Sequence, residues 1–247
     1  MKTLMTTAAL TLTILPALPA MAQDFTFRGG RVDATAIYAN QGFVGGALGK
    51  AGGAFEFGLT DNTFVQVDAA GYGVVGLGAL AGFSAAAGEI GAHLGVDLSD
   101  DAALGVFTSV AYANPGPSVG MATFGAEVIA PVGPFKLEAY AAYSRDLNGL
   151  GGSFYALDAM LYTDLDAQWS IGAGAHLTYL NPGITVVQPR LALRYDFAPD
   201  FSAEGFYAYN ATNVGFSAHS VGLRLTKTFG GGTTFGSRDQ SSLLTGF

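Results

Sequence analysis

The amino-acid sequence predicts an all-β protein that folds as a closed antiparallel transmembrane β-barrel of about 12 strands. Three observations predict this class. The 247 residues are 50% hydrophobic and only 12% charged, which excludes a disordered chain. They include 36 glycines, and each glycine inside a helix costs about 1 kcal/mol relative to alanine. Apolar residues recur at every second position in long runs, which is the period of a strand.

The first 22 residues are expected to form a secretory signal peptide. Lys2 is the only charged residue before Asp24, the stretch from Leu4 to Leu18 is apolar, and the run ends in Ala20-Met21-Ala22. A positive start, a short apolar stretch and a small-residue cleavage site characterise such peptides, and the run is short for a membrane-spanning helix. We therefore expect an exported protein.

Residues 23–229 are expected to form the barrel. In residues 89–97 every second residue is apolar and the others are polar or glycine, and residues 170–179 and 188–197 alternate in the same way. Short polar turns and looser connections follow one another between such runs, and the connections near residues 40–50 and 74–82 are expected to be the longest of the looser kind. The expected strands are residues 28–39, 50–60, 63–73, 83–98, 102–113, 118–130, 134–145, 152–163, 168–180, 185–197, 201–210 and 216–229. Strands of this length, in even number and with two kinds of turn, are typical of membrane barrels.

One stretch resembles a membrane-spanning helix in its hydropathy. Residues 69–88 carry no charge, but they contain six glycines, which a helix tolerates poorly. We interpret them as two strand ends joined by a loop.

The apolar faces of the strands favour a membrane barrel over a soluble β-sandwich. These faces carry almost no charge and end in aromatic residues. Near the looser connections the aromatic residues are Tyr38, Tyr112, Tyr143, Tyr155, Tyr179 and Tyr209, and near the tight turns they are Phe135, Trp169, Phe197, Phe201 and Phe229. Two aromatic belts around a charge-free band suit the two interfaces of a bilayer. Tyr72 is the exception, because its position in the alternation points inward.

The last expected strand carries Val221, Leu223, Leu225 and Phe229 at alternate positions, with Lys227 where an apolar residue would be usual. This pattern resembles the outer-membrane β-barrel proteins of Gram-negative bacteria, the small porins among them. The resemblance implies a place in the cell outer membrane, contact with outer-membrane lipids, and recognition of a terminal aromatic residue by the barrel assembly machinery. Porins of this kind are often trimers, so a homo-oligomer is one assembly that the resemblance implies.

Residues 230–247 are expected to form a periplasmic C-terminal tail outside the barrel. They begin with three glycines, are rich in serine and do not alternate, which argues against a thirteenth strand. The chain ends in Phe247, so either Phe229 or Phe247 is the aromatic residue that assembly requires.

Several functions are excluded or disfavoured by the composition. The net charge of −8 argues against nucleic acid, and the absence of cysteine excludes disulfides and thiolate metal sites. The glycines at 76, 78 and 82 do not have dinucleotide-loop spacing, and the aspartates of residues 97–101 and 164–166 lack the pattern of a calcium loop. His176 and Thr178 are interpreted as a lumen-lining polar pair. We expect no catalytic residues, no metal site and no cofactor.

The candidate functional residues are the charges on the polar faces, which must meet water or each other inside a barrel. An acidic wall is expected from Glu56, Asp68, Glu89, Glu127, Glu138 and Asp158, and a basic wall from Arg31, Arg190, Arg194 and Arg224. Between them we expect a transverse field that favours dipolar or zwitterionic solutes and, because carboxylates outnumber bases, a mild preference for cations.

This pattern favours a porin-like channel for the passive diffusion of small hydrophilic solutes. Two alternatives remain open. One is a closed structural or surface-interaction barrel without transport, filled by internal salt bridges. The other is a lipid-modifying outer-membrane enzyme.

Overall fold

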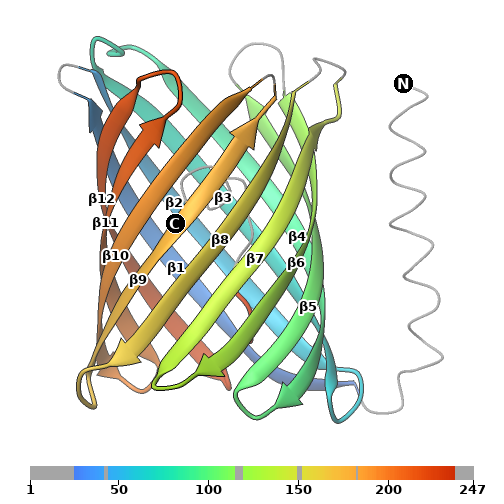
Figure 1. Cartoon of the computed structure of the whole chain (residues 1–247). Helices are drawn as coiled ribbons and strands as arrows, with labels where there is room; N and C mark the ends of the chain where they lie inside the picture. The colour runs from blue at the N-terminus through green and yellow to red at the C-terminus, as the bar shows by residue number, and fades with distance from the viewer. Residues whose placement is uncertain (1–24, 42–43, 115–118, 149–151, 182, 237–247) are drawn as a thin grey trace.

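The computed structural model describes residues 25–41, 44–114, 119–148, 152–181 and 183–236, so the expected signal peptide lies outside the described residues. Twelve antiparallel strands form a closed barrel in which each strand pairs with its neighbours in sequence and the last pairs with the first (Figure 1). The strands are β1 Thr26–Gln41, β2 Val44–Gly58, β3 Thr63–Gly78, β4 Ser84–Ser99, β5 Ala102–Asn114, β6 Val119–Val132, β7 Phe135–Asp146, β8 Ser153–Asp164, β9 Trp169–Leu180, β10 Ile184–Ala198, β11 Phe201–Thr212 and β12 Ser217–Gly230. The predicted fold class is confirmed.

Two connections are shorter than expected. β1 and β2 are separated only by residues 42–43, and β3 and β4 only by residues 79–83. The glycine-rich residues 44–49 and 74–78 therefore belong to strands, where the sequence pattern had predicted loops. The backbones of these residues pair across β2 and β3, from Val44 opposite Gly78 to Gly49 opposite Gly73. The pairing satisfies the backbone N–H and C=O groups, so these residues form strands although their small side chains show no clear alternation.

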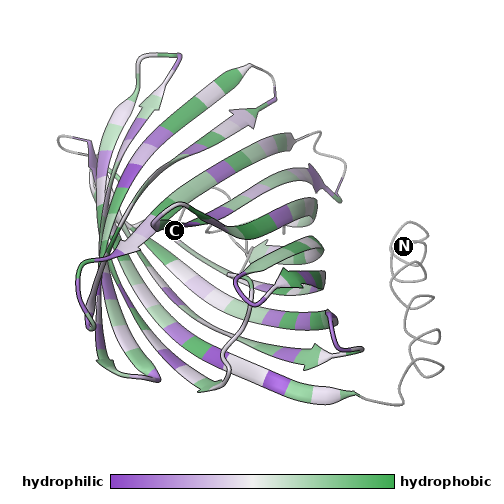
Figure 2. Ribbon diagram, turned by 60° about the horizontal axis from the view of Figure 1, so that its bottom comes forward, coloured by the Kyte–Doolittle hydropathy of each residue, from purple (hydrophilic) through white to green (hydrophobic). Residues whose placement is uncertain are grey.

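The barrel closes between β1 and β12. The register runs from Gly29 opposite Gly230 to Asn40 opposite His219. Polar and apolar bands alternate along the strands in Figure 2, as expected when one face meets the lumen and the other the outside. A one-residue slip would turn every lumen charge outward, so the alternation specifies the register.

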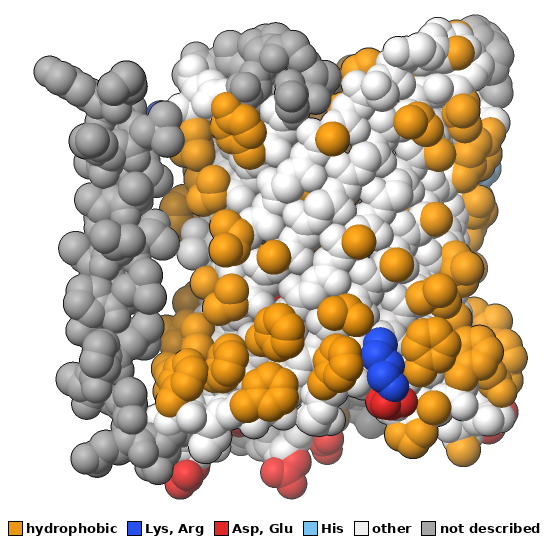
Figure 3. Space-filling view, turned by 180° about the vertical axis from the view of Figure 1, so that it is seen from behind, with side chains coloured by type: hydrophobic (Ala, Val, Ile, Leu, Met, Phe, Trp, Pro, Cys, Tyr) orange, Lys and Arg blue, Asp and Glu red, His pale blue; other side chains and the backbone are white. Residues whose placement is uncertain are grey.

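The outer surface is apolar and carries aromatic residues at both rims. Figure 3 shows hydrophobic side chains gathered along the edge where the tight turns lie. At this edge Trp169 contacts Tyr195 at 4.7 Å between ring centroids, and Phe197 contacts Phe201 at 5.5 Å. At the opposite edge Tyr155 lies between the rings of Tyr143 and Tyr179. No helix in the described ranges is both long and apolar enough to span a membrane.

Lys227 interrupts the apolar face of β12 at the tight-turn rim. Its ammonium donates a hydrogen bond to the carboxylate of Asp200, which lies in the turn between β10 and β11. A lysine near the interface keeps its stem on the apolar surface while its charged end reaches polar partners. The charge of Lys227, at a position where an apolar residue would be usual, is therefore balanced by Asp200 at the rim.

Candidate solute passage inside the barrel

The barrel interior contains a cavity of about 580 Å³ that reaches the tight-turn end. Its wall comes from β7–β12 and from β1 and β2, together with the residues that follow β12. Among the described residues, six basic and six acidic side chains line it: Arg31, Lys50, Lys136, Arg190, Arg194 and Arg224, and Asp33, Glu138, Asp158, Asp164, Asp196 and Glu204. The lining is therefore balanced in formal charge.

The ten residues of the two expected walls separate into two groups. Six of them line the cavity: Arg31, Arg190, Arg194, Arg224, Glu138 and Asp158. The other four, Glu56, Asp68, Glu89 and Glu127, are buried on the interior face of β2, β3, β4 and β6. The excess of carboxylates that predicted cation preference thus lies mainly in buried positions rather than around the cavity.

The basic wall contains carboxylates at close range. Arg194, Glu204 and Arg224 lie directly opposite one another in the register of β10, β11 and β12. Arg224 Nη1 lies 3.3 Å from Glu204 Oε1, and Arg194 Nε lies 2.8 Å from Asp196 Oδ1. On β1, Arg31 Nε lies 3.9 Å from Asp33 Oδ1. Each arginine therefore has its own counter-charge, and the wall is an alternating array instead of a uniform cationic surface.

Asp158 and Arg190 were expected on opposite walls, but the structure pairs them. Arg190 Nη2 donates to Asp158 Oδ2 at 2.5 Å, across the intervening strand β9. Both side chains are more than nine-tenths buried. The bond arises because β8 and β10 flank one strand, so long side chains from both reach over it.

His176 and Thr178 join this pair in one network. His176 Nδ1 lies 3.0 Å from Asp158 Oδ2, and His176 Nε2 lies 2.8 Å from Thr178 Oγ1. A histidine between a carboxylate and a hydroxyl also occurs in acyl-transfer triads. Here, however, Thr178 is 1% exposed and His176 is fully buried, and a nucleophile must be reachable by its substrate. The geometry supports a structural network.

A second buried network lies on the side of β3, β4 and β6. His93 Nδ1 lies 2.5 Å from Glu127 Oε1, and His93 Nε2 lies 3.0 Å from Asp68 Oδ2. Gln66 donates to the other oxygen of Asp68 at 2.8 Å. A ring with a carboxylate at each nitrogen can donate two hydrogen bonds when it is protonated. No group of three or more His, Asp or Glu side chains in the described part of the chain is arranged to hold a metal ion.

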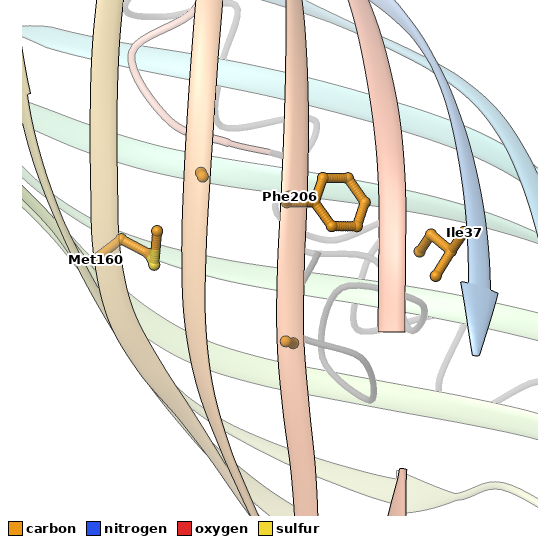
Figure 4. Packing of buried hydrophobic residues seen from close by; sticks show 5 residues of the cluster. Ile37, Met160 and Phe206 are labelled. Atoms are coloured by element: carbon orange, nitrogen blue, oxygen red, sulfur yellow. The ribbon is translucent and has the colours of Figure 1, made fainter. Parts of the chain in front are cut away.

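An apolar cluster borders the cavity on the inner wall. It consists of Ile37, Met160, Ala192, Phe206 and Ala208. Figure 4 shows the Phe206 ring turned toward Ile37 across β12. The residue between them in the register is Gly222, and a Cβ atom there would lie 2.1 Å from the ring. The glycine therefore allows the ring to lie flat against the wall beside the cavity.

The start of the C-terminal tail also lies in the barrel interior, which the sequence pattern did not predict. Thr234 bonds to Glu56 and Phe235 is fully buried, whereas residues 230–247 were expected outside the barrel. Residues 237–247 lie outside the described residues. The tail supplies one hydrogen-bonding and one apolar side chain to the barrel interior.

The interior residues that the sequence pattern did not predict include Lys50, Thr234 and Phe235. Lys50 could have been found, because it shares the inward parity of Glu56 on β2. Thr234 and Phe235 follow a glycine triplet and have no alternation, so no local signal places them.

Neither a family model nor a curated protein matches the sequence. Solved structures match its fold. An outer-membrane channel from Pseudomonas putida F1 has a TM-score of 0.68 at 13% identity, covering 84% of this chain and 97% of that one. The NanC porin has a TM-score of 0.55 at 10% identity, with 79% and 98% covered.

A third neighbour is the beta domain of a Bordetella autotransporter, BrkA, with a TM-score of 0.54 at 10% identity and 81% and 99% covered. The chain has the fold of the Gram-negative outer-membrane β-barrels. Such barrels include both channels and autotransporter domains, so the likeness establishes the fold, and the function has to be argued from the lumen.

Proposed function

We propose that the protein is an outer-membrane channel through which small hydrophilic solutes diffuse passively, without chemistry and without a cofactor. The observation that carries the proposal is the cavity of about 580 Å³ with six basic and six acidic side chains in its wall. Charges inside a membrane barrel are tolerated where they meet water or each other, and here several of them border open space. The fold shared with outer-membrane channels and porins supports the same reading.

The alternating charges favour dipolar solutes over simple ions. Opposite charges on neighbouring strands produce a field that changes sign over a few ångströms, and low-dielectric walls strengthen it. A zwitterion can align with such a field, whereas a single ion meets attraction and repulsion in turn. We therefore infer a preference for small zwitterionic or neutral polar solutes, as expected from the sequence, but without the mild cation preference that was expected beside it.

The test is a conductance measurement on the purified, refolded protein in planar lipid bilayers. Stepwise conductance increments, together with swelling of proteoliposomes in an isosmotic solution of a small zwitterion, support the channel. A folded barrel that inserts but produces neither would contradict it. That outcome would favour the closed barrel without transport, which the buried networks around His93 and Asp158 would then explain.

A further inference from the structure

The chain reverses direction after β12 and returns into the barrel. Gly230 and Gly232 have φ values of 59° and 78°, which residues with a side chain adopt only at a cost. The amide of Gly231 donates to the carbonyl of Arg28 at 3.0 Å. A Cβ atom at Gly29 would lie 2.2 Å from the carbonyl oxygen of Gly232. The turn therefore needs glycine on both strands that it touches, and it directs the chain toward the lumen.

Two consecutive residues attach the returning segment to the barrel wall. The amide and the hydroxyl of Thr234 donate to the two oxygens of Glu56, at 2.7 and 3.0 Å. The amide of Phe235 donates to Gln66 Oε1 at 3.3 Å, and its ring is fully buried. The ring centroid lies 5.5 Å from that of Phe64 and 6.1 Å from that of His93.

The groups that receive the segment are themselves held in position by the barrel. Arg28 Nε donates to Glu56 at 3.1 Å, and its guanidinium carbon lies 4.6 Å from the centre of the Phe64 ring. Gln66 donates its amide to Asp68, which leaves its carbonyl oxygen turned toward Phe235. A Cβ atom at Gly105 would lie 2.5 Å from the Phe235 ring, so the wall is hollowed at this point. The contacts form a preorganised receptor for this part of the chain.

The opposite side of the segment faces the cavity. Residues 231–236 all belong to the lining, together with charged side chains of β7, β8, β10, β11 and β12. The cavity at the tight-turn end is thus bounded on one side by the barrel wall and on the other by this segment. We propose that residues 231–236 form the constriction of the passage and set the largest solute that it admits. This inference rests on the proposed channel function.

Two truncations test the inference in planar bilayers. Deletion of residues 231–247 removes the segment, and deletion of residues 237–247 is the matched control, because it keeps Thr234 and Phe235. We expect the first deletion to raise single-channel conductance by a factor of about two or more, because conductance follows pore diameter, and to admit larger sugars in proteoliposome swelling. The control should behave as the intact chain does.

A full-length variant covers the case in which a truncated chain fails to assemble. Thr234→Pro removes the donated N–H and the hydroxyl, and Phe235→Ala removes the buried ring. The double variant should reproduce the larger conductance, while Val110→Ala, at an exposed position on β5 outside the cavity lining, should not. Heat-modifiable migration on gels verifies that each barrel is folded.

The outcomes separate this inference from the channel function itself. If the intact chain, the deletion of residues 231–247 and the double variant all have the same conductance, residues 231–236 are not the constriction. The proposed channel function would still stand. Silence of the intact chain with conductance of the two altered chains would support the segment as a seal and contradict open diffusion through the intact protein. Silence of every folded variant would overturn both.

Discussion

Arg190 and Arg194 lie on the same inner face of β10, yet their surroundings differ. The side chain of Arg190 is 5% exposed and bonds to the buried Asp158, whereas that of Arg194 is 47% exposed and bonds to the partly exposed Asp196. Removing one partner of a buried ion pair leaves an uncompensated charge, whereas a solvent-exposed pair contributes little. Identical residue types on one strand therefore have different roles.

We expect Arg190→Gln to lower the free energy of unfolding by about 3 kcal/mol, because Asp158 would lose its cationic partner in a buried position. The matched control Arg194→Gln should change it by less than about 1 kcal/mol. Urea unfolding in lipid vesicles measures both. If Asp158→Asn added to Arg190→Gln restores no stability, the buried-charge explanation is wrong.

Phe235 shows how one residue can determine the position of a whole segment. Burial of a phenylalanine ring contributes about 1.5–3 kcal/mol, and the ring is fully buried against Phe64 on β3, His93 on β4 and Gly105 on β5. Phe235→Ala should therefore expose residues 231–236 to a protease added from the tight-turn side, with β12 left intact. Mass spectrometry of the cleaved chain measures this, and equal protection in variant and wild type would contradict it.

β12 combines three functions along one element. Its outward side chains are apolar, Arg224 faces the cavity, and Lys227 lies at the rim, where it bonds to Asp200. The hydrogen bond from Lys227 holds the pKa of Asp200 below its usual value. A lowered carboxyl pKa stabilises the folded state above the ordinary pKa, and this contribution is lost as the pH falls through the lowered value.

We expect Lys227→Gln to raise the pKa of Asp200 toward the ordinary value of about 3.9. The carbon chemical shift of the Asp200 carboxyl, followed by NMR between pH 2 and about 6, reports the midpoint. Lys136→Gln is the control, because Lys136 contacts Glu138 instead. An Asp200 midpoint that does not move in Lys227→Gln would mean that the bond does not persist in solution.

For the molecule as a whole, the balance of charge around the cavity determines ion selectivity. With six basic and six acidic side chains in the lining, the reversal potential in a salt gradient should be close to zero. Replacing Arg194 and Arg224 with Gln leaves six carboxylates facing four bases, so cation preference should appear. Lys227→Gln, on the outer face, should leave the potential unchanged. An unchanged potential in the double variant would show that these arginines do not border the conducting path.

The alternating pattern was sufficient to predict the class of fold and the inward or outward orientation of most side chains. All twelve strands overlap the ranges that the alternation predicts, because a period of two and a lipid-facing band specify the register, although β2 and β3 extend beyond their predicted ends. The ten candidate charges lie on the interior side for the same reason, and so does Tyr72, which lies opposite the cavity-lining Lys50 in the register of β2 and β3. At the glycine-rich strand ends the pattern predicts loops instead, since glycine contributes no side chain to the alternation.

Which charges meet each other was decided by the tertiary structure alone. The pairing of Asp158 with Arg190 depends on how far two side chains reach across β9, and the burial of Glu56 depends on a segment 178 positions further along the chain. Alternation is a local property and carries no information about contacts across a lumen. The sequence by itself therefore determined a barrel with a charged interior, whereas packing decided that part of this interior is closed by the chain's own C-terminal segment and part remains a cavity.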